Sequence, residues 1–155
     1  MVSAENKVRE LNIRLPKAPK PFGAYVEVVQ TGNLLFLSGM LPVENQEPKF
    51  LGRVGKELDG TAAREAAYMA ALNALAVARE YLGSLDKVTR VVRLGVHIAT
   101  SGDFVDQPRV ADGASELLKA VFGEDKMSVR QVMGVASLPM GMPIALEVIL
   151  EVTPK

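Results

Sequence analysis

The chain contains no cysteine, and His97 is its only histidine. Without cysteine it forms no disulfide, no thiolate metal site and no cysteine nucleophile, which fits a reducing compartment. A single imidazole excludes a metal site built on several histidines. We therefore expect neither a bound metal nor a cofactor.

Residues that favour nucleic-acid binding are also scarce. Lys plus Arg (18) equals Asp plus Glu (18), so the formal net charge is zero, and only 5% of the residues are aromatic. A neutral chain gives phosphate groups no net attraction, and few aromatic side chains are present for bases to stack on. We expect no nucleic-acid partner.

Long apolar segments are missing as well. No stretch approaches the roughly 18 consecutive apolar residues of a membrane span. The first 15 residues carry scattered charges in place of the apolar centre of a secretory signal. These patterns predict a cytoplasmic protein with no membrane partner.

The length of 155 residues predicts one domain, because domains commonly hold roughly 100–200 residues. Pro16, Pro19 and Pro21 interrupt any helix that starts near the N-terminus. We expect an N-terminal arm over residues 1–20 and a single domain over residues 21–155.

Hydrophobic patterning predicts a hairpin, a helix, a strand, a second helix and two further strands. The expected ranges are 24–31 and 34–38 for the hairpin, 61–82 and 106–122 for the helices, and 88–99, 130–136 and 144–152 for the other strands. Two helices in this order would cover one face of the sheet, which gives a two-layer α+β domain. The other face mixes small, apolar and charged side chains, and a second subunit or water would cover it.

Two finer features follow from the same patterns. Thr61 is expected to cap the first helix, because its hydroxyl could accept a hydrogen bond from the first turn. Val92 is expected to share one face of the long strand with Leu94, Val96 and Ile98, because alternate residues of a strand point the same way.

Few single residues could carry chemistry. His97 could act as a general base, but no serine or aspartate stands beside it at readable spacing, which favours a hydrogen-bonded side chain on the sheet face. Glu147 and Glu151 lie roughly 13 Å apart along a strand, which is too far for paired-carboxylate chemistry.

Arg130 opens a strand after a helix and a short loop, where it could bind a carboxylate or form a surface salt bridge.

Two segments together resemble the YjgF/RidA family of reactive-intermediate (enamine/imine) deaminases. One contains Gly-Ala-Tyr-Val at residues 23–26 and Gly-Asn-Leu-Leu-Phe-Leu-Ser-Gly-Met-Leu-Pro at residues 32–42. The other is Arg-Gln-Val-Met-Gly-Val-Ala-Ser-Leu-Pro at residues 130–139. Asn73 and the pair Asp103-Phe104 also fit. The resemblance spans residues 21–152 and looks like a divergent branch of the family.

The resemblance implies a chorismate-mutase-like fold and a homotrimer, in which the uncovered sheet faces form a central barrel and three clefts lie between subunits. The residues implied as ligand-binding are Arg130, which would hold a carboxylate, with Tyr25, Ser38 and Val132. Val132 stands where the family usually has a cysteine, and its backbone groups would serve in place of the thiol.

No catalytic residue is assigned with certainty. The family's water-positioning glutamate corresponds to Ala145, and Glu147 stands two residues further on. The family's pocket asparagine falls near Ser115. We therefore expect a trimer that binds small 2-oxo or 2-imino acids, with imine hydrolysis weakened by the loss of that glutamate. A non-catalytic binding or regulatory module is the alternative, and ribonuclease activity is disfavoured by the neutral charge and few aromatic residues.

Overall fold

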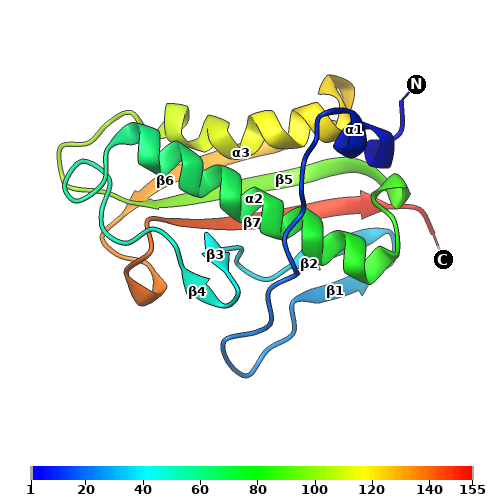
Figure 1. The fold of residues 1–155 in the computed structure, drawn as a ribbon, viewed down its shortest axis with the longest axis horizontal. Helices are drawn as coiled ribbons and strands as arrows, with labels where there is room; N and C mark the ends of the chain where they lie inside the picture. Colours follow the sequence, from blue (N-terminus) through cyan, green and yellow to red (C-terminus); the bar gives the residue numbers. More distant parts are fainter. Residues whose placement is uncertain (1, 155) are drawn as a thin grey trace.

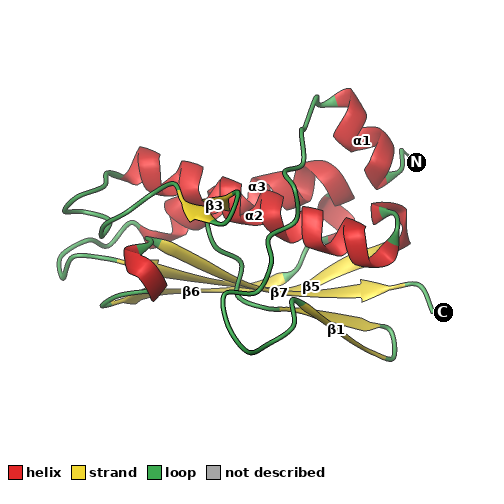
Figure 2. Ribbon diagram, turned by 60° about the horizontal axis from the view of Figure 1, so that its bottom comes forward, coloured by secondary structure: helices red, strands yellow, loops and turns green. Residues whose placement is uncertain are grey.

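The computed structural model describes residues 2–154. A five-stranded sheet of order β1-β2-β7-β5-β6 forms one layer, and the helices lie on one of its faces (Figures 1 and 2). The strands are β1 (Val28–Thr31), β2 (Leu34–Leu37), β5 (Val88–Ala99), β6 (Val129–Val135) and β7 (Ile144–Val152). Only β5 and β6 pair in parallel, so the sheet is mixed. The expected two-layer α+β fold is confirmed.

Within residues 2–154 there are three α-helices: α1 (Ala4–Glu10), α2 (Gly60–Leu82) and α3 (Gln107–Phe122). The cap of α2 is Asp59, whose Oδ1 accepts a hydrogen bond of 2.8 Å from the Ala62 N–H. Thr61 as the cap is therefore wrong, because the helix already begins at Gly60 and Asp59 caps its first turn. The helix ends at Leu82, and Gly83 caps it with a φ of 84°, which suits glycine.

The core lies between the helices and the sheet. The inward side of β7 is buried, with exposures of 0–2% at Ile144, Leu146, Val148, Leu150 and Val152. Alanines of α2 face this layer, and Gly113 of α3 lies so close to α2 that an added Cβ would stand 2.3 Å from the Arg64 carbonyl oxygen. Small side chains thus bring the two helices and the sheet into close contact.

The structure corrects the prediction of which residues of the long strand β5 face the core. Val91 is fully buried and Val92 only partly so, although alternation from Leu94 predicts the reverse. The register with β7 shifts between Val91 and Arg93, so two residues of β5 oppose one of β7. A bulge of this kind resets the alternation, and one sequence cannot reveal it.

The N-terminal residues lie along the helical layer. Val8 of α1 is buried in the core, and α1 packs against α3. Residues 13–27 then cross the outside of α2 without regular structure and lead into β1 (Figure 1). A small ribbon, β3 (Val43–Glu44) and β4 (Glu47–Pro48), is held to α2 because Asn73 Nδ2 donates hydrogen bonds to the Leu41 and Val43 carbonyls. The division into arm and domain stays a prediction.

Within residues 2–154, no helix is both long and apolar enough to cross a membrane. The same residues contain no group of three or more histidine, cysteine or acidic side chains placed to hold a metal ion.

Candidate functional site

Arg130 lies on β6, the edge strand of the sheet, and its side chain points towards the helical layer. Val132, two residues on, packs against the core from the same side. The Arg130 Nη1 donates a hydrogen bond of 2.7 Å to Asp112 Oδ1 and one of 3.1 Å to Ser115 Oγ, both on α3. The guanidinium is therefore held in place by the helix that crosses above it.

One edge of this guanidinium remains open. Its Nε and Nη2 have no hydrogen-bond partner among the described residues, and the Arg130 side chain is 28% exposed. The Nε and Nη2 groups together form the fork that binds a carboxylate through two parallel hydrogen bonds. The pair with Asp112 therefore orients Arg130 without filling the fork.

Sequence reasoning missed Asp112. It reached Ser115 only as the position of the family's asparagine. A usable signal was present, because residues 112 and 115 are three apart and share one side of a helix. The spacing of these two residues does not, however, predict which strand their side of the helix faces.

Tyr25 and Ser38 lie at the opposite edge of the sheet, near β1 and β2. Ser38 Oγ donates a hydrogen bond of 2.6 Å to the Val26 carbonyl, and the Ser38 N–H donates one of 2.9 Å to the Glu27 carbonyl. The Tyr25 hydroxyl oxygen accepts a hydrogen bond of 2.9 Å from the Phe22 N–H. Both polar side chains are thus fixed by the segment that enters β1.

The four predicted ligand-binding residues form two separate pairs in one chain. Strands β7 and β5 lie between β2 and β6, which places Ser38 and Arg130 about 14 Å apart at three strand spacings of roughly 4.8 Å. Tyr25 with Ser38, and Arg130 with Val132, therefore share a site only if the two sheet edges belong to different copies of the chain.

The uncovered face of the sheet carries Ala145 and Glu147. Glu147 Oε1 accepts a hydrogen bond of 3.0 Å from Arg93 Nε, and Arg93 Nη2 donates one of 3.2 Å to Gln131. The guanidinium crosses Gly95, where a side chain would crowd Glu147. Glu147 is thus paired through one oxygen with Arg93, and it stands two residues beyond Ala145 on the same face of β7.

His97 pairs with Ala145 in the sheet and is half-buried. The hydrogen bond expected for its imidazole is not found among residues 2–154. No serine or cysteine stands beside it as a nucleophile in the register of β5, so its surroundings give no support to acyl-transfer chemistry.

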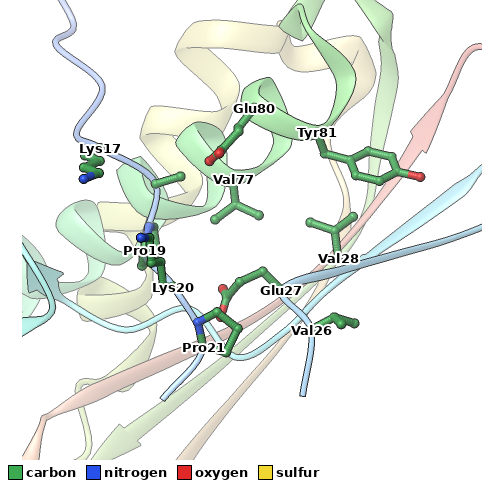
Figure 3. A pocket seen from close by; sticks show the side chains of 11 residues that line it. Lys17, Pro19, Lys20, Pro21, Val26, Glu27, Val28, Val77, Glu80 and Tyr81 are labelled. Atoms are coloured by element: carbon green, nitrogen blue, oxygen red, sulfur yellow. The ribbon is translucent and has the colours of Figure 1, made fainter. Parts of the chain in front are cut away.

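A separate cavity of about 410 Å³ lies under the proline-rich segment (Figure 3). Residues 17–21 form one wall, residues 26–28 the floor, and Val77, Glu80 and Tyr81 of α2 the roof. Burial raises the pKa of Glu27 above its usual value. None of the four predicted ligand-binding residues lines this cavity.

Comparisons with known proteins find a matching family and similar proteins. Residues 5–150 match the family described as "YjgF/chorismate mutase-like, putative endoribonuclease". The chain is 37% identical to Protein TCP17 of Trypanosoma cruzi, over 93% of this chain and 91% of that protein. It is 30% identical to the 2-iminobutanoate/2-iminopropanoate deaminase of Dermatophagoides farinae, over 89% and 93% of the two chains.

One solved structure is similar in both sequence and fold. A protein of unknown function from Agrobacterium tumefaciens superposes with a TM-score of 0.88 at 36% identity, covering 97% of this chain and 92% of that one. The family match spans nearly all the described residues. The chain therefore belongs to the YjgF/RidA family.

Proposed function

We propose that the chain forms a homotrimer that binds small 2-oxo or 2-imino acids in clefts between subunits, and that it hydrolyses imines slowly there. The open Nε–Nη2 edge of Arg130 carries this proposal. The relative from Dermatophagoides farinae is named for a deaminase of 2-imino acids. A ligand of this class has the carboxylate that such a fork binds.

Assembly is supported by the uncovered face of the sheet. Val29 and Phe36 are cross-strand neighbours with exposures of 50% and 39%, and Ile149 stands next to Phe36 on β7. Three adjacent apolar side chains on a face with no helix of its own favour burial against another copy. The family resemblance sets the expected number of copies at three.

The reaction needs little from the protein. Hydrolysis adds water across the C=N bond, releases ammonia and leaves a 2-oxo acid. A protonated imine carbon is already electrophilic, so the site must mainly hold the substrate and place a water. Arg130 would hold the carboxylate. Ala145 offers no general base to the water, which would lower the rate by about 10²–10⁴-fold relative to a site that has one.

The test is hydrolysis of 2-iminopropanoate by the wild-type chain, Arg130→Ala and Arg109→Ala. Arg109 is a matched control, because it is an exposed arginine on α3 that pairs only with Asp106. We expect kcat/KM to fall at least about 100-fold in Arg130→Ala and to stay unchanged in Arg109→Ala. Equal background rates in all three would overturn the enzyme proposal. A monomer in sedimentation experiments would overturn the shared cleft.

A non-catalytic binding module is the second candidate. Ala145 favours it, because this position then has no carboxylate to activate water, and the nearby Glu147 is paired through one oxygen with Arg93. Calorimetric titration with 2-oxobutanoate separates the two functions. Saturable binding that Arg130→Ala abolishes, without turnover of 2-iminopropanoate, would establish the module.

A further inference from the structure

We propose that Asp112 makes the Arg130 site selective for zwitterionic acids, in which an ammonium or iminium nitrogen lies next to the carboxylate, over 2-oxo acids of the same skeleton. This inference rests on the proposed function, in which Arg130 binds the ligand carboxylate. It assigns to Asp112 a role in choosing among the ligands that Arg130 can hold.

Asp112 is placed to act on a ligand as well as on Arg130. Only its Oδ1 is bonded, and Oδ2 has no hydrogen-bond partner among the described residues. Its side chain is 44% exposed, more than the 28% of Arg130. Ser115 takes a second hydrogen bond from Arg130 Nη1. The free carboxylate oxygen of Asp112 and the free fork of Arg130 therefore belong to one half-exposed pair.

The charges of this pair discriminate between ligand classes. Arg130 and Asp112 together are neutral, so a ligand with only a carboxylate makes the site negative and is repelled by Asp112. A zwitterion brings its own positive nitrogen, which Asp112 attracts. A carboxylate beside the binding arginine thus disfavours the wrong ligand as well as favouring the right one.

The same selectivity would separate substrate from product. A protonated 2-imino acid is a zwitterion, and the 2-oxo acid formed when ammonia leaves carries no positive nitrogen. The positive charge that Asp112 attracts is lost in the reaction. Substrate would then bind more tightly than product, and release of the 2-oxo acid would follow from the same ion pair.

The experiment compares L-alanine with pyruvate, which share three carbons and a carboxylate and differ at the second carbon. Affinities are measured by calorimetry for the wild-type chain, Asp112→Asn, Arg130→Ala and Asp106→Asn. Asp106 is the matched control, because it lies at the start of α3, makes no cap hydrogen bond and pairs only with Arg109. Thermal unfolding of each variant checks that it is folded.

We expect the wild type to bind L-alanine at least about tenfold more tightly than pyruvate, and Asp112→Asn to bring this ratio close to one. Asp106→Asn should keep the wild-type ratio, and Arg130→Ala should bind neither ligand. A merely structural role of Asp112 would weaken both ligands alike and leave the ratio unchanged, which would overturn the inference while the proposed function stands. Tighter binding of pyruvate by the wild type would do the same. Failure of both ligands to bind the wild type would overturn both proposals.

Discussion

Arg79 and Arg130 each pair with a carboxylate from another element. We call the Arg79 pair closed, because the carboxylate occupies the Nε–Nη2 edge, and the Arg130 pair open, because no described residue occupies that edge. Arg79 of α2 donates from Nε and Nη2 to both oxygens of Glu5 on α1, at 2.8 and 2.9 Å for the two shortest contacts. Arg130 donates to Asp112 from Nη1 alone. A closed pair has used its hydrogen-bonding groups within the fold, whereas an open pair keeps some for a ligand.

The charges of the Arg79–Glu5 pair also stabilise the fold. The hydrogen bond between Arg79 and Glu5 holds the pKa of Glu5 below its usual value of 4.5 and raises the pKa of Arg79. The contact therefore stabilises the charged forms of both groups in the folded chain. It also ties α1 to α2, so its role is in the fold.

The largest effect is expected where α3 is positioned over Arg130. Gly113→Ala would place a Cβ 2.3 Å from the Arg64 carbonyl oxygen, so α3 must move away from α2. In an ordinary helix this change stabilises by about 1 kcal/mol, but here we expect a loss of about 2–4 kcal/mol in the free energy of unfolding. Urea unfolding measures it.

Gly60→Ala is the control for that variant, because Gly60 is also helical and an added Cβ there meets open space. Unchanged or slightly raised stability is expected. If Gly113→Ala were as stable as Gly60→Ala, α2 and α3 would not approach each other this closely in solution. The position of Asp112 over Arg130 would then need another explanation.

Much of this arrangement is predictable from sequence because its signals are local. The alternation from Ile144 to Val152 predicts β7 and its buried face, and Gly123 predicts the end of α3. Arg130 is correctly placed at the start of a strand. Each of these depends on neighbours within a few residues.

The features that were missed depend on contacts between distant segments. Arg130 and Asp112 are 18 positions apart and meet only because α3 crosses β6. The bulge at Val92 is a property of the register between β5 and β7. The separation of Tyr25 from Arg130 follows from the order of the strands in the sheet. None of these leaves a periodic pattern in the sequence.

The closed pair predicts a loss of stability in acid. Because folding lowers the pKa of Glu5, its contribution is fully present above the usual value of 4.5 and is lost as the pH falls through the lower folded value. Glu5→Gln should cost about 1 kcal/mol at pH 7, a modest amount because Arg79 is partly exposed. The variant and the wild type should converge towards pH 3, as measured by urea unfolding at each pH.

Glu10→Gln is the matched control, because Glu10 lies on the same helix and makes only a distant, exposed pair with Lys7. It should follow the wild-type curve at every pH. A constant difference between Glu5→Gln and the wild type down to pH 3 would mean that packing of the Glu5 side chain, and not its charge, holds α1 against α2.

The smallest effect is expected at Glu27, which extends the comparison to a carboxylate with no ion pair among the described residues. Lys17, Lys20 and Glu80 line the same cavity (Figure 3), and burial raises the pKa of Glu27. A raised pKa reverses the sign found for Glu5: the charged form is disfavoured by folding, so stability falls as the pH rises from 4.5 through the folded value. Glu27→Gln should therefore gain a little stability at pH 7 and match the wild type below pH 4. Glu80→Gln removes one charge from the same cavity and serves as the control. A loss of stability in Glu27→Gln at pH 7 would place a cation, from Lys17 or Lys20, against that carboxylate in solution.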